Sequence, residues 1–290
     1  LVMGHLNLLA ARAVAKGIDP MKVIRALSYN PVKHYNLDVG LLQINDPADF
    51  IVVNNLDHFE VEKTYINGEL VASNKTSHIM PVTAPVVNQF NCKKIEKQDI
   101  VAPASSNKIR VIEALDGQLI TKEHAAELDI IDNQLQANVD KDILKLVVVN
   151  RYHPAKPAVA FVKNFGLKRG AIASSVAHDS HNIIAVGVND AEIVNAINLV
   201  IEAKGGVSFS DANEQLILPL PIAGLMSNED GYKVAAQYAH LDRKSKEAGS
   251  TLSAPYMTLS FLALLVIPQL KLSDKGLFDG QRFQFTSVFI

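Results

Sequence analysis

Four short apolar segments in the second half of the chain constrain its fold more than any other feature. Residues 144–149, 158–162, 171–177 and 183–188 each have the length of a buried strand, and turn residues separate them. Asn189 and Glu192 then have the spacing of a capping box, which predicts the start of a helix. Four apolar residues share one face of this helix and Gly205-Gly206 ends it: Ile193, Ile197, Val200 and Ile201. This order of elements predicts an α/β pattern from about residue 109 onward.

The residues that follow extend this pattern to the C-terminus. Residues 207–209 and 215–218 predict a further hairpin, and residues from about 229 to 248 predict a long helix. Residues 261–267 are apolar and are predicted to be buried. This part of the chain therefore holds enough apolar residues for a core of its own.

The N-terminal part begins with two amphipathic helices. Leu6, Leu9, Ala10 and Ala13 have helical spacing, and Gly17 is placed to stop the first helix. Asp19-Pro20 predicts the start of a second helix, which is expected to end near Asn30-Pro31 because a residue before proline resists the helical region. Two helices of this size cannot bury their apolar faces on each other alone. We therefore expect them to need a larger body.

The start of the chain has an unusual character. Leu1-Val2-Met3-Gly4-His5 runs directly into the first helical pattern, with no basic region and no cleavage-site pattern before it. We therefore expect the chain to be the C-terminal portion of a longer protein, or one whose earlier residues are missing.

A strand-rich segment follows the helices. Residues 49–53, 61–66 and 69–71 are predicted strands, and Asn67-Gly68 is a strong signal for a two-residue hairpin turn. Residues 73–108 are polar and interrupted by proline, which predicts a linker with one or two strands in it.

Composition excludes several classes of function. The length of 290 residues favours two domains or one large one. The balance of 28 basic and 30 acidic residues argues against nucleic acid as a partner. Cys92 is the single cysteine, so a disulfide framework is excluded and a reducing, cytoplasmic setting is expected. The longest apolar stretch is 261–267, far short of the about 20 residues that cross a bilayer, so no membrane partner is expected.

The first 75 residues resemble the C-terminal end of the amidohydrolase superfamily. In that superfamily the last helices of a TIM-like barrel lead into a β-sandwich through motifs of this order and spacing. The motifs that carry the resemblance are Asn30-Pro31-Val32, Gly40-Leu41-Leu42, Pro47-Ala48-Asp49-Phe50-Ile51-Val52 and Tyr65-Ile66-Asn67-Gly68-Glu69-Leu70-Val71. From propensity alone, the same segment is equally consistent with an ordinary junction between helices and strands.

The rest of the chain resembles the C-terminal domain of bacterial-type adenine deaminases. Four motifs carry this resemblance: Ala177-His178-Asp179-Ser180-His181-Asn182-Ile183-Ile184, Leu218-Pro219-Leu220-Pro221-Ile222-Ala223-Gly224-Leu225-Met226-Ser227, the segment from Ala254-Pro255-Tyr256 to Leu270-Lys271-Leu272, and Asp274-Lys275-Gly276-Leu277-Phe278-Asp279. The family implies hydrolysis of adenine to hypoxanthine and ammonia by a metal-activated water. It also implies an α/β multi-domain chain in three parts. Residues 1–38 would be the last helices of a TIM-like barrel, 39–95 a small β-sandwich part with a linker, and 96–290 an α+β domain with a mixed sheet.

The metal site that the resemblance implies has no counterpart in this sequence. In the superfamily a binuclear manganese or iron site uses a His-x-His pair, further His or Glu ligands and an Asp after the last barrel strand. The chain contains no His-x-His pair, and the expected Asp would lie upstream of Leu1. We therefore expect no metal on this chain alone and no deaminase activity without the missing barrel, because a metal supplies the hydroxide for such reactions at neutral pH.

The polar segment His178-Asp179-Ser180-His181-Asn182 is the best candidate for a site. It lies between two predicted strands, so it is predicted to be a turn. In an extended strand His178 and His181 would point to opposite faces, whereas in a turn they could converge. Three interpretations stay open: a structural turn in which Asp179 and Asn182 satisfy backbone N–H groups, a contribution to the active-site mouth, and a metal site. His178, Asp179 and His181 are the catalytic candidates, and Ser180 and Asn182 are candidates for binding substrate.

A few other residues complete the set. His5 is a candidate for substrate binding because residues after a last barrel strand can face the catalytic mouth, but a surface or capping role is favoured. Arg110, Arg151 and Arg169 form no visible stripe. Phe283-Gln284-Phe285 and Val288-Phe289-Ile290 are apolar enough to suggest a subunit contact in a homo-oligomer.

Two alternatives to an adenine-binding role remain for this chain. Residues 109–290 could be a non-catalytic module for oligomerisation or lid formation. The whole protein could also be a related amidohydrolase that acts on a cyclic amide or another purine.

Overall fold

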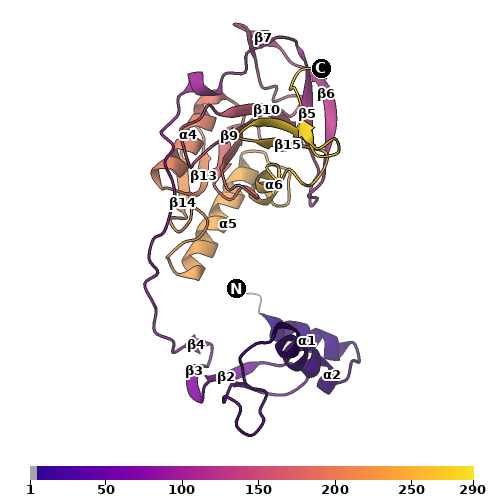
Figure 1. Ribbon diagram of the computed structural model, residues 1–290, viewed down its shortest axis with the longest axis vertical. Coiled ribbons are helices and arrows are strands. Elements are labelled where there is room, and N and C mark those ends of the chain that lie inside the picture. Colours follow the sequence, from indigo (N-terminus) through magenta and orange to yellow (C-terminus); the bar gives the residue numbers. More distant parts are fainter. Residues whose placement is uncertain (1–4) are drawn as a thin grey trace. The chain divides into compact units, whose positions relative to one another are not determined.

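The computed structural model describes residues 5–290, which form two compact units (Figure 1). The first unit extends to Thr83 and the second comprises Ala84–Ile290. Leu1 to Gly4, on which the expectation about the start of the chain partly rests, lie outside the described residues. No helix within residues 5–290 is long and apolar enough to cross a membrane.

The first unit begins with helix α1 (Leu6–Ala15), which stops just before Gly17 as predicted, with φ of 85° at the glycine. Asp19 caps α2 (Pro20–Ile24) by accepting hydrogen bonds from the N–H groups of Met21 and Lys22. The prediction that this helix ends near Asn30-Pro31 is wrong. The helical path continues through a π-helical turn η1 (Arg25–Tyr29) into α3 (Asn30–Tyr35). The wider π turn relieves the usual clash between a proline ring and the carbonyl four residues before it.

The helices of the first unit bury few apolar side chains on each other, as the sequence led us to expect. Ala10, Val23 and Phe59 form its only cluster of buried hydrophobic residues among those described. Leu6 and Leu9 are 53% and 49% exposed.

An antiparallel sheet follows these helices, in the order β1 (Phe50–Val53), β2 (Val61–Ile66), β3 (Glu69–Ser73) and β4 (Thr76–Ser77). The predicted hairpin turn at Asn67-Gly68 is confirmed, with φ of 49° and 81°. The carboxylate of Asp49 accepts hydrogen bonds from the N–H groups of Asn67 and Gly40, which hold its pKa below the usual value. The structure does not confirm a TIM-like barrel for residues 1–38.

The second unit is built on a mixed sheet of eight strands. Their order is β14 (Gln215–Pro219), β13 (Gly206–Ser210), β11 (Ala171–Ser174), β12 (Ile183–Gly187), β9 (Ile143–Val149), β10 (Ala158–Lys163), β5 (Lys108–Ala114) and β6 (Thr121–Glu127). Only β10 and β5 pair in parallel. The predicted strands and the 207–218 hairpin are therefore confirmed, except that the strand expected over 171–177 ends at Ser174. The sequence reasoning did not single out β5, β6 or the short pair β7 (Ile130–Ile131) and β8 (Gln134–Leu135).

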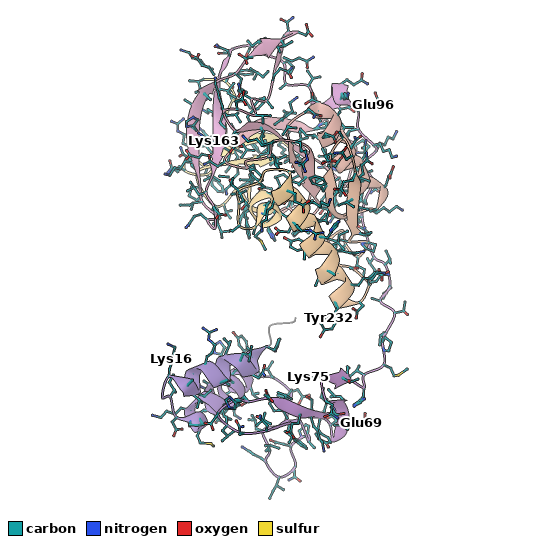
Figure 2. All side chains as sticks on the ribbon, turned by 180° about the vertical axis from the view of Figure 1, so that it is seen from behind. Lys16, Glu69, Lys75, Glu96, Lys163 and Tyr232 are labelled. Atoms are coloured by element: carbon teal, nitrogen blue, oxygen red, sulfur yellow. The ribbon has the colours of Figure 1, made fainter. Side chains whose placement is uncertain are left out.

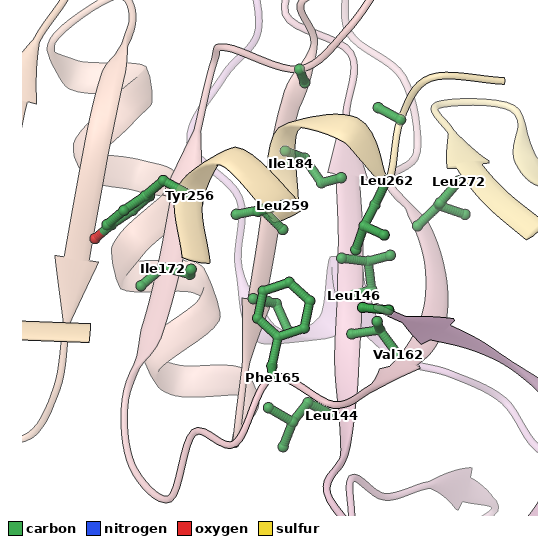
Figure 3. Close-up of a cluster of buried hydrophobic side chains, with 14 of the residues drawn as sticks. Leu144, Leu146, Val162, Phe165, Ile172, Ile184, Tyr256, Leu259, Leu262 and Leu272 are labelled. Carbon is green, nitrogen blue, oxygen red and sulfur yellow. The ribbon is translucent and has the colours of Figure 1, made fainter. Parts of the chain in front are cut away.

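Alternate residues of the central strands enter two different cores. Val147, Ala173 and Ala185 pack with α4 (Asp190–Glu202) on one face of the sheet. Leu146, Ile172 and Ile184 pack on the other face with α5 (Gly231–Glu247), α6 (Pro255–Phe261) and the small sheet β15 (Leu270–Ser273), β16 (Gly276–Asp279) and β17 (Gln284–Phe285) (Figure 3). The period of two along a strand places neighbouring residues on opposite faces. Tyr232, in the first turn of α5, is 64% exposed (Figure 2).

Three sequence-based details of this unit need correction. Asn189 caps α4 by accepting from the Glu192 N–H, but the Glu192 carboxylate accepts from the Ser210 hydroxyl instead of closing the capping box. Residues 261–267 are only partly buried, because α6 ends at Phe261 and Val266 is 60% exposed in the turns that follow. The segment predicted as a linker over 73–108 belongs to the second unit from Ala84, and it contains the short 3-10 helix η2 (Lys97–Ile100) with the buried Ile100.

Candidate functional site

A polar cluster lies where β9 ends and β12 begins. Val149, the last residue of β9, pairs with Ile183, the first residue of β12. Arg151, two residues after the end of β9, is thereby brought beside the turn that precedes β12, and its backbone N–H donates to Asn182 Oδ1 at 3.2 Å. We call Arg151 together with Asn88, Tyr152, the 178–182 turn and Gly224 the Arg151 cluster.

The Arg151 side chain is a buried cation without a carboxylate partner. It is 4% exposed, and none of the ion pairs formed by the described residues includes it. Nη1 donates to Asn88 Oδ1 at 3.3 Å, and Nη2 donates to the Tyr152 hydroxyl at 3.0 Å. The guanidinium also lies 4.7 Å from the ring centre of Tyr152 and 5.6 Å from that of Phe90. Amide, hydroxyl and aromatic groups thus replace water around this charge.

Gly224, from the proline-rich motif, packs directly against this guanidinium. A Cβ atom at Gly224 would overlap Arg151 Nη1 in its observed position, and the φ of 69° at this residue also favours glycine. The Ser175 hydroxyl donates to the Gly224 carbonyl at 2.6 Å and accepts from the Gly206 N–H at 2.8 Å. These bonds hold the motif against the ends of β11 and β13.

The turn predicted for residues 178–182 is confirmed, and it brings its two histidines together. The ring centres of His178 and His181 are 5.4 Å apart, in an edge-to-face arrangement. The His178 ring also stacks on Phe261 at 4.7 Å, and its backbone N–H donates to the Ser260 carbonyl. The motif that contains α6 therefore packs against this turn.

Asn182 has the structural role that the sequence suggested, but Asp179 does not. Asn182 is 2% exposed and holds the Arg151 N–H, whereas Asp179 and Ser180 are exposed. No hydrogen bond of the Asp179 carboxylate to a backbone N–H occurs among the described residues. An exposed carboxylate in such a position is solvated by water, and it is free to meet a ligand.

His181 is held in its neutral form by its surroundings. Partial burial is the largest cause that lowers its pKa, followed by the nearby His178 and the Arg151 cation, while Asp179 opposes them. Its Nδ1 atom is buried and has no hydrogen-bond partner. A neutral imidazole in this position can donate through one ring nitrogen and accept through the other.

The last of the sequence motifs reaches the same end of the sheet. Asn150 donates to Asp274 Oδ2 at 2.8 Å, and its own Oδ1 accepts from the N–H groups of Tyr152 and His153. All four motifs of the second unit therefore contact residues 150–152 or the 178–182 turn. Sequence reasoning missed Arg151, because its role depends on contacts with Asn88 and Asn182, 63 and 31 residues away.

His5 lies in the first unit, where its exposed side chain makes no capping hydrogen bond to α1. Its predicted contact with substrate stays a prediction.

The described residues do not fit the metal that the amidohydrolase resemblance implies. Within residues 5–290, no three His, Cys, Asp or Glu side chains are grouped so that they could hold a metal ion. His178, His181 and Asp179 are thus not grouped in this way, and the interpretation of the turn as a metal site stays untested.

The fold and the cluster together define an α+β domain with a buried polar cluster at one end of its central strands, joined to a smaller unit of helices and an antiparallel sheet. The family model of the adenine deaminase C-terminal domain matches residues 118–284, and that of the amidohydrolase family matches residues 2–71. The chain therefore belongs to the adenine deaminase C-terminal domain family, which confirms the resemblance inferred from its motifs.

Curated relatives agree with this assignment. A protein named adenine deaminase from Salinibacter ruber is 51% identical over 292 residues, covering 100% of this chain and 53% of the relative. Proteins of the same name from Sulfurovum sp. (strain NBC37-1) and Methanosarcina barkeri are 53% and 47% identical, covering 97% and 99% of this chain and 51% and 53% of their own lengths. The chain thus spans about half the length of the curated relatives it matches.

Proposed function

We propose that the protein to which this chain belongs hydrolyses adenine to hypoxanthine and ammonia. The observation that carries this proposal is the 51% identity, over the whole chain, to a relative named adenine deaminase. The name of that relative, and of the others at 47% and 53% identity, favours adenine over a cyclic amide or another purine as the substrate. We also propose a cytoplasmic location and no nucleic-acid or membrane partner.

In this proposal the exposed side of the 178–182 turn contributes to the mouth of the active site. Adenine is flat and uncharged, with ring nitrogens that accept hydrogen bonds and an amino group that donates them. The turn offers matching groups, because His178 and His181 present aromatic rings, Ser180 a hydroxyl and Asp179 a carboxylate. Asn182 acts indirectly, since it is buried and holds Arg151.

Replacing His178 and His181 together by alanine in the full-length protein tests this role. We expect kcat/KM for adenine to fall at least about tenfold, which is the loss expected for a hydrogen bond or ring contact to substrate. His124→Ala is the matched control, because His124 lies on the edge strand β6 and has no contact with the cluster. Turnover within about twofold of wild type, with an intact fold, would instead favour a non-catalytic module for oligomerisation or lid formation.

We further propose that the family's metal, manganese or iron, is held by residues outside this chain. The support is the lack, within residues 5–290, of any grouping of three side chains able to hold a metal. Metal analysis of the purified 290-residue chain is expected to give substoichiometric metal and no deaminase activity. One tightly held ion per chain would contradict this proposal and would assign a metal to the turn.

The C-terminal end is our candidate for a contact between subunits in a homo-oligomer. Phe283, Phe285 and Ile290 are 68%, 50% and 56% exposed, which is unusual for large apolar side chains so close together in the sequence.

A further inference from the structure

Two buried polar atoms of the Arg151 cluster lack a hydrogen-bond partner. Among the described residues only three buried side-chain atoms are in this state: Arg151 Nε, His181 Nδ1 and Ser250 Oγ. The arginine atom can only donate, whereas a neutral histidine nitrogen can accept. Buried polar groups are rarely left unpaired without a reason. These two atoms therefore indicate that the cluster constrains the protonation state of His181.

Arg151 is linked to both neighbours of His181 in the chain, directly to Asn182 and through the Tyr152 hydroxyl to Ser180. On one side its backbone N–H donates to Asn182 Oδ1 at 3.2 Å. On the other side its Nη2 donates to the Tyr152 hydroxyl at 3.0 Å, and that hydroxyl donates to the Ser180 carbonyl at 2.7 Å. The position of the His181 backbone is thus fixed from Arg151 in both directions.

The charges around His181 select one of its two neutral forms. Arginine keeps its proton at any ordinary pH, and its positive charge disfavours a second positive charge nearby. The neutral form of the His181 imidazole is therefore favoured. The buried Nδ1 lies in the field of this cation, which favours a lone pair on Nδ1 and the proton on Nε2. The charged or titratable groups that act on the ring are Arg151 after β9 and His178 and Asp179 within the turn. Nε2 forms no hydrogen bond with a protein group, and it is not among the buried atoms that lack a partner. It is therefore the ring nitrogen that faces outward.

We propose that Arg151 is a positioning residue that holds His181 as the Nε2–H tautomer, and that this N–H donates a hydrogen bond to a ring nitrogen of the bound purine. The proposal rests on the proposed function, namely that the 178–182 turn contacts adenine. Arg151 itself does not contact the purine in this arrangement. Its charge selects the tautomer, and its bonds to the Tyr152 hydroxyl and the Asn182 side chain hold the position of His181.

The test uses the full-length protein and measures, by competition, the dissociation constants of four ligands. These are adenine, 1-deazaadenine, 3-deazaadenine and 7-deazaadenine. Each analogue replaces one ring nitrogen by C–H and so removes one acceptor. We expect His181→Ala to weaken adenine and two of the analogues about tenfold, and to leave unchanged the binding of the analogue that lacks the contacted nitrogen. His181→Gln should recover most of the affinity, because its amide places an N–H near the position of Nε2. His124→Ala serves as the control and should change none of the four constants.

Tyr152→Phe and Arg151→Gln test the positioning role. Tyr152→Phe keeps the ring that stacks on Arg151 and removes only the hydroxyl between Arg151 and Ser180. We expect both variants to weaken binding with the same dependence on the analogue as His181→Ala. If Arg151→Gln does not fold, Tyr152→Phe decides the matter alone.

Three results would overturn the proposal: no loss of affinity in His181→Ala, an equal loss for all four ligands, or full affinity in Tyr152→Phe. Failure of the proposed function would show differently, because the wild-type protein would then neither bind nor deaminate adenine.

Discussion

Gly205→Ala is expected to destabilise the second unit by about 3–5 kcal/mol, which corresponds to a fall in Tm of roughly 6–20 °C. Gly205 closes the end of α4 with φ of 121°, a region that side chains rarely adopt. A Cβ atom there would also lie 2.4 Å from the Gly224 Cα and 2.7 Å from the Leu220 carbonyl oxygen. Both neighbours are backbone atoms, so relief requires a shift of the backbone at Gly205 or in the loop that carries Leu220 and Gly224.

Gly276→Ala is a matched control for this substitution. Gly276 has φ of 124°, almost the same as Gly205, but a Cβ atom there would meet nothing within 4 Å. The two variants therefore share the backbone strain, and we expect a cost of only about 1–2 kcal/mol for Gly276→Ala. Thermal unfolding by calorimetry measures both. Equal shifts in Tm would show that the close contact between Gly205 and the Gly224 loop contributes nothing.

The parts of this fold that the sequence predicted depend on local signals. The Asn67-Gly68 turn, the Asn189 cap and the stop at Gly17 are each decided by residues within one turn of chain. The strands β9 and β12 were predictable for the same reason, because their uninterrupted apolar sequences indicate burial. Two local predictions failed for different reasons: the Ser210 hydroxyl on β13 donates to the Glu192 carboxylate, which therefore does not close the capping box, and a π-helical turn continues the helical path past Pro31.

The candidate site was only half predictable for a related reason. The turn at 178–182 follows from its position between two strands, but the convergence of its histidines required the turn geometry, which the sequence left open. Arg151 carried no signal at all. Its burial depends on Asn88, on a missing Cβ at Gly224 and on an aromatic ring at Phe90, and no periodicity joins these positions. Long-range contacts of this kind become visible only when the strand order is known.

The contribution of a second buried cation to the stability of the chain is expected to rise with pH between about 8 and 10. Lys271 in β15 is fully buried, and its Nζ donates to the carbonyls of Leu119 and Phe261 at 2.6 and 3.0 Å, with no carboxylate partner. Burial lowers the pKa of Lys271 to about 8 from an ordinary value of 10.5. Between these values the unfolded chain binds more protons than the folded one, so stability increases as the pH rises. The full effect is about 3 kcal/mol.

Lys271→Met isolates this contribution, because methionine fills similar space and does not titrate. The variant loses two donors, which shifts its stability by a constant amount, but the difference between the two proteins should grow in favour of wild type from pH 8 to pH 10. Urea unfolding at each pH, followed by circular dichroism, gives this difference. The thiol of Cys92, whose pKa burial raises to about 11, acts in the opposite direction above pH 9, but it is present in both proteins and cancels.

A difference that stays flat from pH 7 to pH 10 would show that the two carbonyls keep the Lys271 ammonium charged in the folded state. The expected loss of the Lys271 proton also matters for the Arg151 cluster. Lys271 ties β15 to the carbonyl of Phe261, and the ring of Phe261 stacks on His178. A lysine that loses its proton near pH 8 holds this carbonyl less strongly than an ammonium does, since charged donors form the stronger hydrogen bonds. The support of His178 is therefore expected to weaken over the same pH range in which the fold gains stability.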